Sequence, residues 1–264
     1  MVPVQIRSQP QTYYMQLDTG YSETIFYAVP DTVKNALIGD FKGSGPFYLP
    51  LYVAGNLVTM SGIKIKTSPA ASMDGPYPEI GTIGQNIILA RVVFIDFVHQ
   101  RIAFIKKEDV KPSYLEGVSF VPMHYRDDQF FIPVTINGVS YPDDYFYDSG
   151  SSMFTLITTS AVWQQITGST ASNPKNDILH VTQWGSIATL LGAKLLDRLT
   201  IGPLNIDSPM VYFQQSGGVA GSSLAGANYP VKGIIGNAAF YDCCMIVIDA
   251  PNNRFGIAVK HPVH

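Results

Sequence analysis

The sequence predicts an all-β protein made of two homologous halves, and three observations indicate this. The 264 residues are 46% hydrophobic and 12% aromatic but only 14% charged, which is typical of compact globular proteins and unlike disordered chains or coiled coils. Apolar residues alternate with polar ones, as in residues 56–65 and 199–213, and 23 glycines and 18 prolines punctuate the chain. Two blocks of sequence also occur twice, in the same order.

The first repeated block is an aromatic and aliphatic run that ends in Asp-Thr/Ser-Gly, at residues 18–20 and again at 148–150. The second block is Gly-x-Ile-Gly, at residues 81–84 and 233–236. The aspartate and the last glycine are 66 residues apart in the first half and 88 in the second. An Ile-Asp pair follows in each half, and its aspartate lies 12 residues after that glycine in the first half and 13 in the second. The two halves therefore differ mainly by a loop insertion.

These repeats divide the chain into an N-terminal lobe, residues 1–110, and a C-terminal lobe, residues 120–264, each with one of the two aspartates. Residues 111–119 are the expected linker, next to the most charged stretch of the sequence, residues 106–112.

Two short helices are expected after the Asp-x-Gly turns. One covers residues 31–38, with Asp31 as a candidate N-cap. The other covers residues 160–166, with Ser160 as the N-cap and Gly168 at the end.

Charge and motif content exclude several function classes. Seventeen Lys and Arg against twenty Asp and Glu give a net charge of −3 without a run of one sign, so nucleic acid is not an expected partner. A membrane span would need ~20 apolar residues, and the sequence has no such stretch. The five histidines are scattered and the only two cysteines are adjacent, so no metal site is expected. Few charges and many tyrosines favour an exported protein, periplasmic or extracellular, over a cytoplasmic one.

The two aspartates suggest a chemistry. An aspartate at the end of a buried strand is costly unless its charge is shared or hydrogen-bonded. If the halves pack about a pseudo-twofold axis, Asp18 and Asp148 meet at the interface, where carboxyls ~3 Å apart cannot both ionise. One then keeps a proton while the other stays charged, so the pair can deprotonate a water and protonate the carbonyl that the water attacks.

Over nearly its whole length the chain resembles the pepsin and retropepsin aspartic peptidases, through both Asp-Thr/Ser-Gly turns, both Gly-x-Ile-Gly blocks and the C-terminal run 232–258. The resemblance implies two pepsin-like (acid protease) β lobes related by a pseudo-twofold axis, and an aspartic endopeptidase that binds an extended polypeptide in the cleft between them. It implies no metal or organic cofactor, and an active monomer because both lobes lie in one chain.

Carried over by position, the resemblance makes Asp18 and Asp148 the catalytic pair and gives the neighbouring residues supporting roles in the two active-site loops: Thr19, Gly20, Ser149, Gly150 and Ser151. The hydroxyls of Thr19 and Ser149 would tie the loops together, and the Ser151 hydroxyl would bond the outer oxygen of the second carboxylate. Tyr21 stands at the corresponding place in the first lobe and departs from the pepsin pattern.

The substrate-covering flap of this family has no recognisable motif here. Gly43 and Ser44 are the candidate tip in the first lobe, and Trp184 and Gly185 are the counterpart in the second. Two ordinary hairpin turns are the alternative.

Two other functions remain open. A binding or inhibitor protein could keep the pepsin fold without turnover, as Tyr21 and the missing flap motif suggest. An unrelated structural or lectin-like β protein would hold Asp18 and Asp148 far apart.

Overall fold

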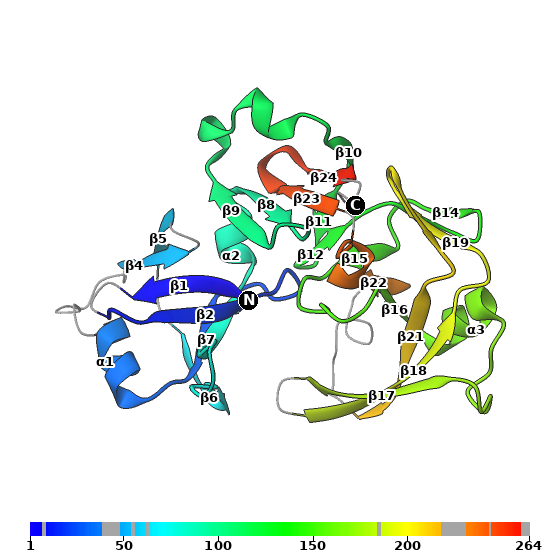
Figure 1. Cartoon of the computed structure of the whole chain (residues 1–264), viewed down its shortest axis with the longest axis horizontal. Coiled ribbons are helices and arrows are strands. Elements are labelled where there is room, and N and C mark those ends of the chain that lie inside the picture. Colours follow the sequence, from blue (N-terminus) through cyan, green and yellow to red (C-terminus); the bar gives the residue numbers. More distant parts are fainter. Residues whose placement is uncertain are drawn as a thin grey trace.

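The computed structural model describes residues 1–6, 9–38, 48–53, 56–61, 64–183, 186–217, 231–242 and 244–259. Within these ranges the chain forms 24 strands in four sheets, three short α-helices and four 3₁₀ helices. The prediction of a mostly β protein is confirmed. Figure 1 shows the strands in three groups, with α1 beside the group of β1 and β2 and α3 beside the group of β18 and β21.

The first group is a seven-stranded sheet in the order β5-β4-β1-β2-β7-β3-β6. Its strands are β1 (Val2–Ile6), β2 (Thr12–Leu17), β3 (Ile25–Ala28), β4 (Tyr48–Val53), β5 (Asn56–Ser61), β6 (Ile65–Ala70) and β7 (Glu79–Ile83). Burial alternates along β1 and β2, because one face of the sheet covers the core.

A second group contains an eight-stranded sheet, β11-β12-β15-β22-β16-β21-β18-β17, and a four-stranded sheet, β14-β13-β19-β20. The strands of the larger sheet are β11 (His124–Arg126), β12 (Gln129–Phe131), β15 (Tyr145–Tyr147), β16 (Leu156–Thr158), β17 (Asp177–Gln183), β18 (Ser186–Lys194), β21 (Met210–Gly217) and β22 (Gly233–Ile235). The smaller sheet consists of β13 (Val134–Ile136), β14 (Val139–Tyr141), β19 (Arg198–Ile201) and β20 (Leu204–Asp207).

The third group is a five-stranded sheet, β10-β24-β23-β8-β9, that combines three strands from the middle of the chain with the last two strands. It contains β8 (Val92–Asp96), β9 (Arg101–Ile105), β10 (Ser119–Pro122), β23 (Cys244–Asp249) and β24 (Arg254–Val259). The antiparallel register of β8 and β23 is symmetric about the pair Phe94 and Val247: two positions outward along each strand, Val92 faces Asp249 and Asp96 faces Met245. These hairpins, β8–β9 and β23–β24, are the ones in which the sequence repeats Ile-Asp.

The same three-strand arrangement occurs at both Asp-x-Gly turns. Strand β7 pairs in parallel with β2 and antiparallel with β3, and β22 pairs in parallel with β15 and antiparallel with β16. The repeated Gly-x-Ile-Gly block supplies β7 and β22. Its last glycine is required sterically, because a Cβ on Gly84 would lie 2.3 Å from the Glu23 carbonyl oxygen and one on Gly236 would lie 2.1 Å from that of Ser151.

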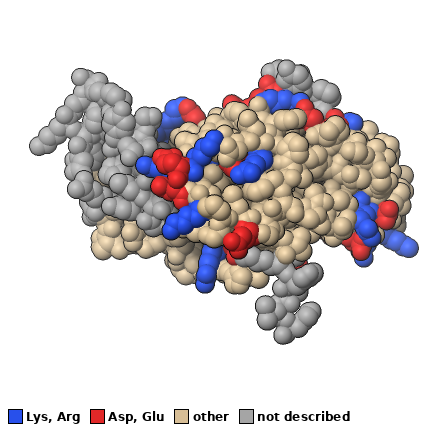
Figure 2. All heavy atoms as spheres, turned by 90° about the horizontal axis from the view of Figure 1, so that it is seen from above, with Lys and Arg blue, Asp and Glu red and all other residues tan. Residues whose placement is uncertain are grey.

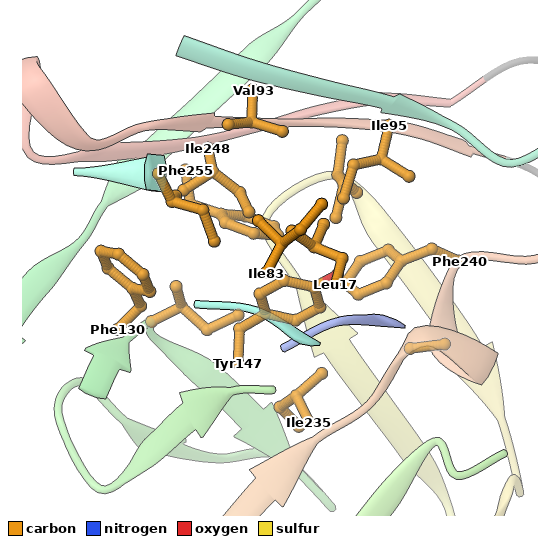
Figure 3. Packing of buried hydrophobic residues seen from close by; sticks show 14 of the residues in the cluster. Leu17, Ile83, Val93, Ile95, Phe130, Tyr147, Ile235, Phe240, Ile248 and Phe255 are labelled. Atoms are coloured by element: carbon orange, nitrogen blue, oxygen red, sulfur yellow. The ribbon is translucent and has the colours of Figure 1, made fainter. Parts of the chain in front are cut away.

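The main hydrophobic core runs beneath both turns. Figure 3 shows Leu17 and Ile83, which end β2 and β7, packed in one cluster with Tyr147 and Ile235, which end β15 and β22. Phe240 and residues of the five-stranded sheet complete the labelled part of the cluster: Val93, Ile95, Ile248 and Phe255, with Phe130 from β12. The residues before each aspartate are therefore held in a shared apolar core, which limits how far either turn can move.

The α-helices are α1 (Asp31–Ile38), α2 (Gln85–Ile88) and α3 (Ser160–Thr167), and the 3₁₀ helices are η1 (Lys107–Asp109), η2 (Pro112–Leu115), η3 (Asn237–Ala239) and η4 (Ala250–Asn252). Both N-cap assignments are wrong by one residue. Helix α1 already includes Asp31, and α3 is capped by Thr159, whose hydroxyl accepts from the Val162 N–H, with Ser160 as the first helical residue. The predicted end of α3 is confirmed, since Gly168 has φ 66°.

None of the helices in these ranges combines the length and apolar character that a bilayer-crossing helix needs. The face shown in Figure 2 carries acidic and basic side chains in small mixed clusters, and most of its described surface is uncharged.

Candidate active site

Each aspartate sits where a strand ends and the chain turns. The Asp18 N–H donates to the Ile83 carbonyl at 3.0 Å, and the Asp148 N–H donates to the Ile235 carbonyl at 2.9 Å. The two turns are therefore fixed in the same way by the last residue of β7 and of β22. Their sequences place a carboxyl at the same point of each three-strand arrangement.

The structure brings Asp18 and Asp148 into direct contact. Each carboxyl faces the backbone of the other turn, and the two lie close enough for their charges to interact. A Cβ built on Gly20 would lie 2.9 Å from Cγ of Asp148, and one on Gly150 would lie 2.8 Å from Cγ of Asp18. Glycine is needed at both positions because any side chain would displace the opposite carboxyl.

The two turns are tied together by hydrogen bonds that cross between them. The Thr19 hydroxyl accepts from the Ser149 N–H at 2.9 Å and donates to the Tyr147 carbonyl at 3.0 Å. The Ser149 hydroxyl accepts from the Thr19 N–H at 3.0 Å and donates to the Leu17 carbonyl at 2.9 Å. Thr19 is fully buried and Ser149 is 3% exposed, so water cannot replace these four bonds.

Both carboxyls accept hydrogen bonds from their own turns. The Gly20 N–H donates to Asp18 Oδ1 at 2.9 Å, and the Gly150 N–H donates to Asp148 Oδ1 at 2.8 Å. Asp148 also accepts a bond at Oδ2 from the Ser151 hydroxyl at 3.1 Å. Tyr21 occupies the matching position of the first turn and has no hydroxyl on Cβ, so the two carboxyls differ in their surroundings.

This difference separates the two acids. Burial, reinforced by the negative charge of Asp148, holds the pKa of Asp18 well above its ordinary value. Burial also raises the pKa of Asp148, but the Gly150 N–H and the Ser151 hydroxyl act in the opposite direction by stabilising its ionised form. The Gly20 N–H acts on Asp18 in the same way, so the bond from Ser151 is the difference between the two, and it favours ionisation of Asp148 with the proton on Asp18. A neighbouring acid and base of this kind can together move protons to and from a bound water.

Two residues of the site escaped the sequence analysis. The side-chain amide of Gln85 donates to the Thr19 carbonyl, and that of Asn237 donates to the Ser149 carbonyl at 3.0 Å. Each directly follows the Gly-x-Ile-Gly block, so extending the comparison of the two halves by one residue would have found the matching amides. Gln16 adds a third such contact, from Nε2 to the Gly150 carbonyl at 3.2 Å.

The flap candidates Gly43, Ser44, Trp184 and Gly185 lie outside the residues that the structure describes. Among the described residues, no cluster of three or more His, Cys, Asp or Glu side chains is arranged to hold a metal ion.

Comparison with protein families gives no matching family, and no curated protein matches the chain. The geometry of the site is therefore the basis on which a function can be inferred.

Proposed function

We propose that this protein is an aspartic endopeptidase in which Asp18 and Asp148 activate a water molecule against an internal peptide bond. The observation that carries the proposal is the contact between two buried carboxyls, each hydrogen-bonded by its own turn and each packed against the glycine of the other. A protein without acid–base chemistry gains nothing from such a pair, because two buried acids repel each other when both ionise.

The surroundings of the two acids suggest their roles. The ionised Asp148 takes a proton from water as the water oxygen attacks the peptide carbonyl carbon, and Asp18 gives its proton to the carbonyl oxygen. The product is a tetrahedral diol. Its collapse breaks the C–N bond, with a proton passing to the leaving nitrogen and a carboxyl group forming on the other fragment.

The proposal includes a pepsin-like architecture of two lobes, residues 1–110 and 120–264. It is supported by the two matching three-strand arrangements around the aspartates and by the symmetric register of β8 and β23. With one turn from each lobe in the same chain, the active form is a monomer, and the substrate is an extended polypeptide lying across the two turns.

Hydrolysis of denatured casein between pH 3 and 7 tests the proposal. Wild-type protein should cleave it and a transition-state peptide inhibitor of this enzyme class should stop the reaction, whereas Asp148→Asn should be inactive and folded by circular dichroism. Asp207→Asn, which alters a 78% exposed aspartate side chain far along the chain from both turns, is the matched control and should cleave normally. Absence of cleavage by the wild type at every pH would refute the proposal and leave the alternative, a pepsin-fold binding or inhibitor protein.

A further inference from the structure

Gln85 is a fully buried polar side chain that joins three parts of the chain. Its amide nitrogen donates to the carbonyls of Thr19, in the first turn, and of Asp128, at the tip of the β11–β12 hairpin. Its amide oxygen accepts from the hydroxyl of Tyr125, on β11, at 2.8 Å. These contacts leave only one orientation of the amide, because exchanging N and O would set acceptor against acceptor at both carbonyls.

At the second turn, Asn237 makes two contacts that correspond to those of Gln85 with Thr19 and Tyr125. Its amide nitrogen donates to the Ser149 carbonyl at 3.0 Å, and its amide oxygen accepts from the Tyr147 hydroxyl at 2.6 Å. Each turn is thus held by an amide whose orientation is set by a tyrosine. The tyrosine of the second turn is the residue next to Asp148, whereas that of the first turn, Tyr125, comes from a hairpin more than 100 residues further along the chain.

Each amide donates a hydrogen bond to the carbonyl oxygen of a peptide group, and the N–H of the same peptide group donates to a carboxyl. The peptide between Thr19 and Gly20 presents its oxygen to Gln85 and its N–H to Asp18 Oδ1. The peptide between Ser149 and Gly150 presents its oxygen to Asn237 and its N–H to Asp148 Oδ1. Because a peptide group is planar, fixing the direction of the oxygen also fixes the direction of the N–H.

We propose that Gln85 and Asn237 are positioning residues that aim the Gly20 and Gly150 N–H groups at the two carboxyls, and that Tyr125 fixes the orientation of Gln85. The proposal rests on the endopeptidase function proposed above. It gives the β11–β12 hairpin, which lies in the second half of the chain by sequence, a role in the site, because the hairpin holds Gln85 and Gln85 holds the first turn.

The backbone of the hairpin fits this role. Asp127 and Asp128 both have positive φ, 47° and 55°, as a tight two-residue hairpin turn requires, although neither is glycine. This turn presents the Asp128 carbonyl to Gln85, and the single proton of the Tyr125 hydroxyl is shared between Gln85 Oε1 and Asp128 Oδ1, which lies 3.0 Å away.

The test compares Gln85→Met, which keeps an unbranched side chain of similar size, with Tyr125→Phe, which keeps the ring contact with Phe130. Gln165→Met, on the exposed side of α3, is the matched control. The readouts are the pH profile of kcat/KM and, independently of catalysis, the titration of ¹³C-labelled aspartate carboxyls by NMR. The titratable groups that face the contacts of Gln85 and Asn237 with the two turns are Asp18, Asp148, Tyr125, Asp128 and Tyr147. All of them are retained in Gln85→Met.

Loss of the aimed Gly20 N–H removes a bond that stabilises the ionised form of Asp18. In Gln85→Met the basic limb of the pH profile, which reports the ionisation of Asp18, should therefore move upward by about 0.5–1 unit, and kcat should fall about tenfold with KM nearly unchanged. Tyr125→Phe should move this limb in the same direction by less, and the double variant no further than Gln85→Met, because Tyr125 acts through Gln85.

A merely structural role would lower the unfolding temperature without moving the limbs or the NMR titration, and that result in folded Gln85→Met would overturn the proposal. If Gln85→Met does not fold, the carboxyl titration of Tyr125→Phe decides: a shift supports the proposal and no shift refutes it. If the wild type hydrolyses nothing, the endopeptidase function fails, and the NMR titration still decides the positioning role.

Discussion

The hydrogen bonds that cross between the two turns predict a large loss of stability in Thr19→Val. Valine has nearly the shape of threonine, so the variant leaves no cavity. It removes the hydroxyl that accepts from the Ser149 N–H at 2.9 Å and donates to the Tyr147 carbonyl at 3.0 Å. Both backbone groups stay buried without that partner, and each costs about 1–3 kcal/mol, so the free energy of unfolding should fall by about 2–6 kcal/mol.

Urea denaturation measures this loss, with the fluorescence of the fully buried Trp163 as one probe of unfolding. Thr200→Val is the matched control. It removes a hydroxyl that donates to Asn205 on an exposed part of the β19–β20 hairpin, and it should change the unfolding free energy by less than about 0.5 kcal/mol. A loss below about 1 kcal/mol in Thr19→Val would show that the crossing bonds do not hold the turns together, and the reasoning about the site would be wrong.

Two further predictions concern the titration of the carboxyl pair. The pKa of Asp18 is raised in the folded protein, so the folded state binds more protons than the unfolded state from pH ~4 upward, and stability must fall as the pH rises through this window. Asp18→Asn should therefore gain stability relative to the wild type between pH 4 and 7 in urea titrations; parallel pH dependences would contradict the raised pKa. Ser151→Ala removes the 3.1 Å bond to the ionised form of Asp148, so the pKa of Asp148 should rise and the acidic limb of the kcat/KM profile should move upward by less than about one unit. An unchanged limb would show that this hydroxyl does not act on the carboxylate.

The sequence could predict the strand content because it is local, and it could predict that Asp18 and Asp148 meet because the two halves repeat each other. Alternating apolar residues indicate a strand wherever one face of it is buried. Each repeated block also needs glycine at a fixed position, because a Cβ on Gly84 or Gly236 would collide with backbone atoms. The error at α3 is also local: Thr159 and Ser160 can both cap a helix, and composition does not choose between neighbours.

The partner of Gln85 is beyond prediction for a different reason. The repeat places an amide after each Gly-x-Ile-Gly block, but it does not indicate that Gln85 contacts Tyr125, which lies 40 residues away. Only the three-dimensional arrangement shows that the two are partners. The symmetric pairing of β8 with β23 is equally hidden, because register between distant strands follows from how the whole chain packs.

The five-stranded sheet limits how early the protein can complete its folding during synthesis. Phe94 and Val247 pair across 153 residues, so the sheet cannot close before residue 247 has left the ribosome. Contacts that span such a separation form slowly, because a long loop must be closed before they stabilise anything. The second turn likewise needs Ile235, whose carbonyl accepts from the Asp148 N–H, so a growing chain cannot complete the carboxyl site early in its synthesis.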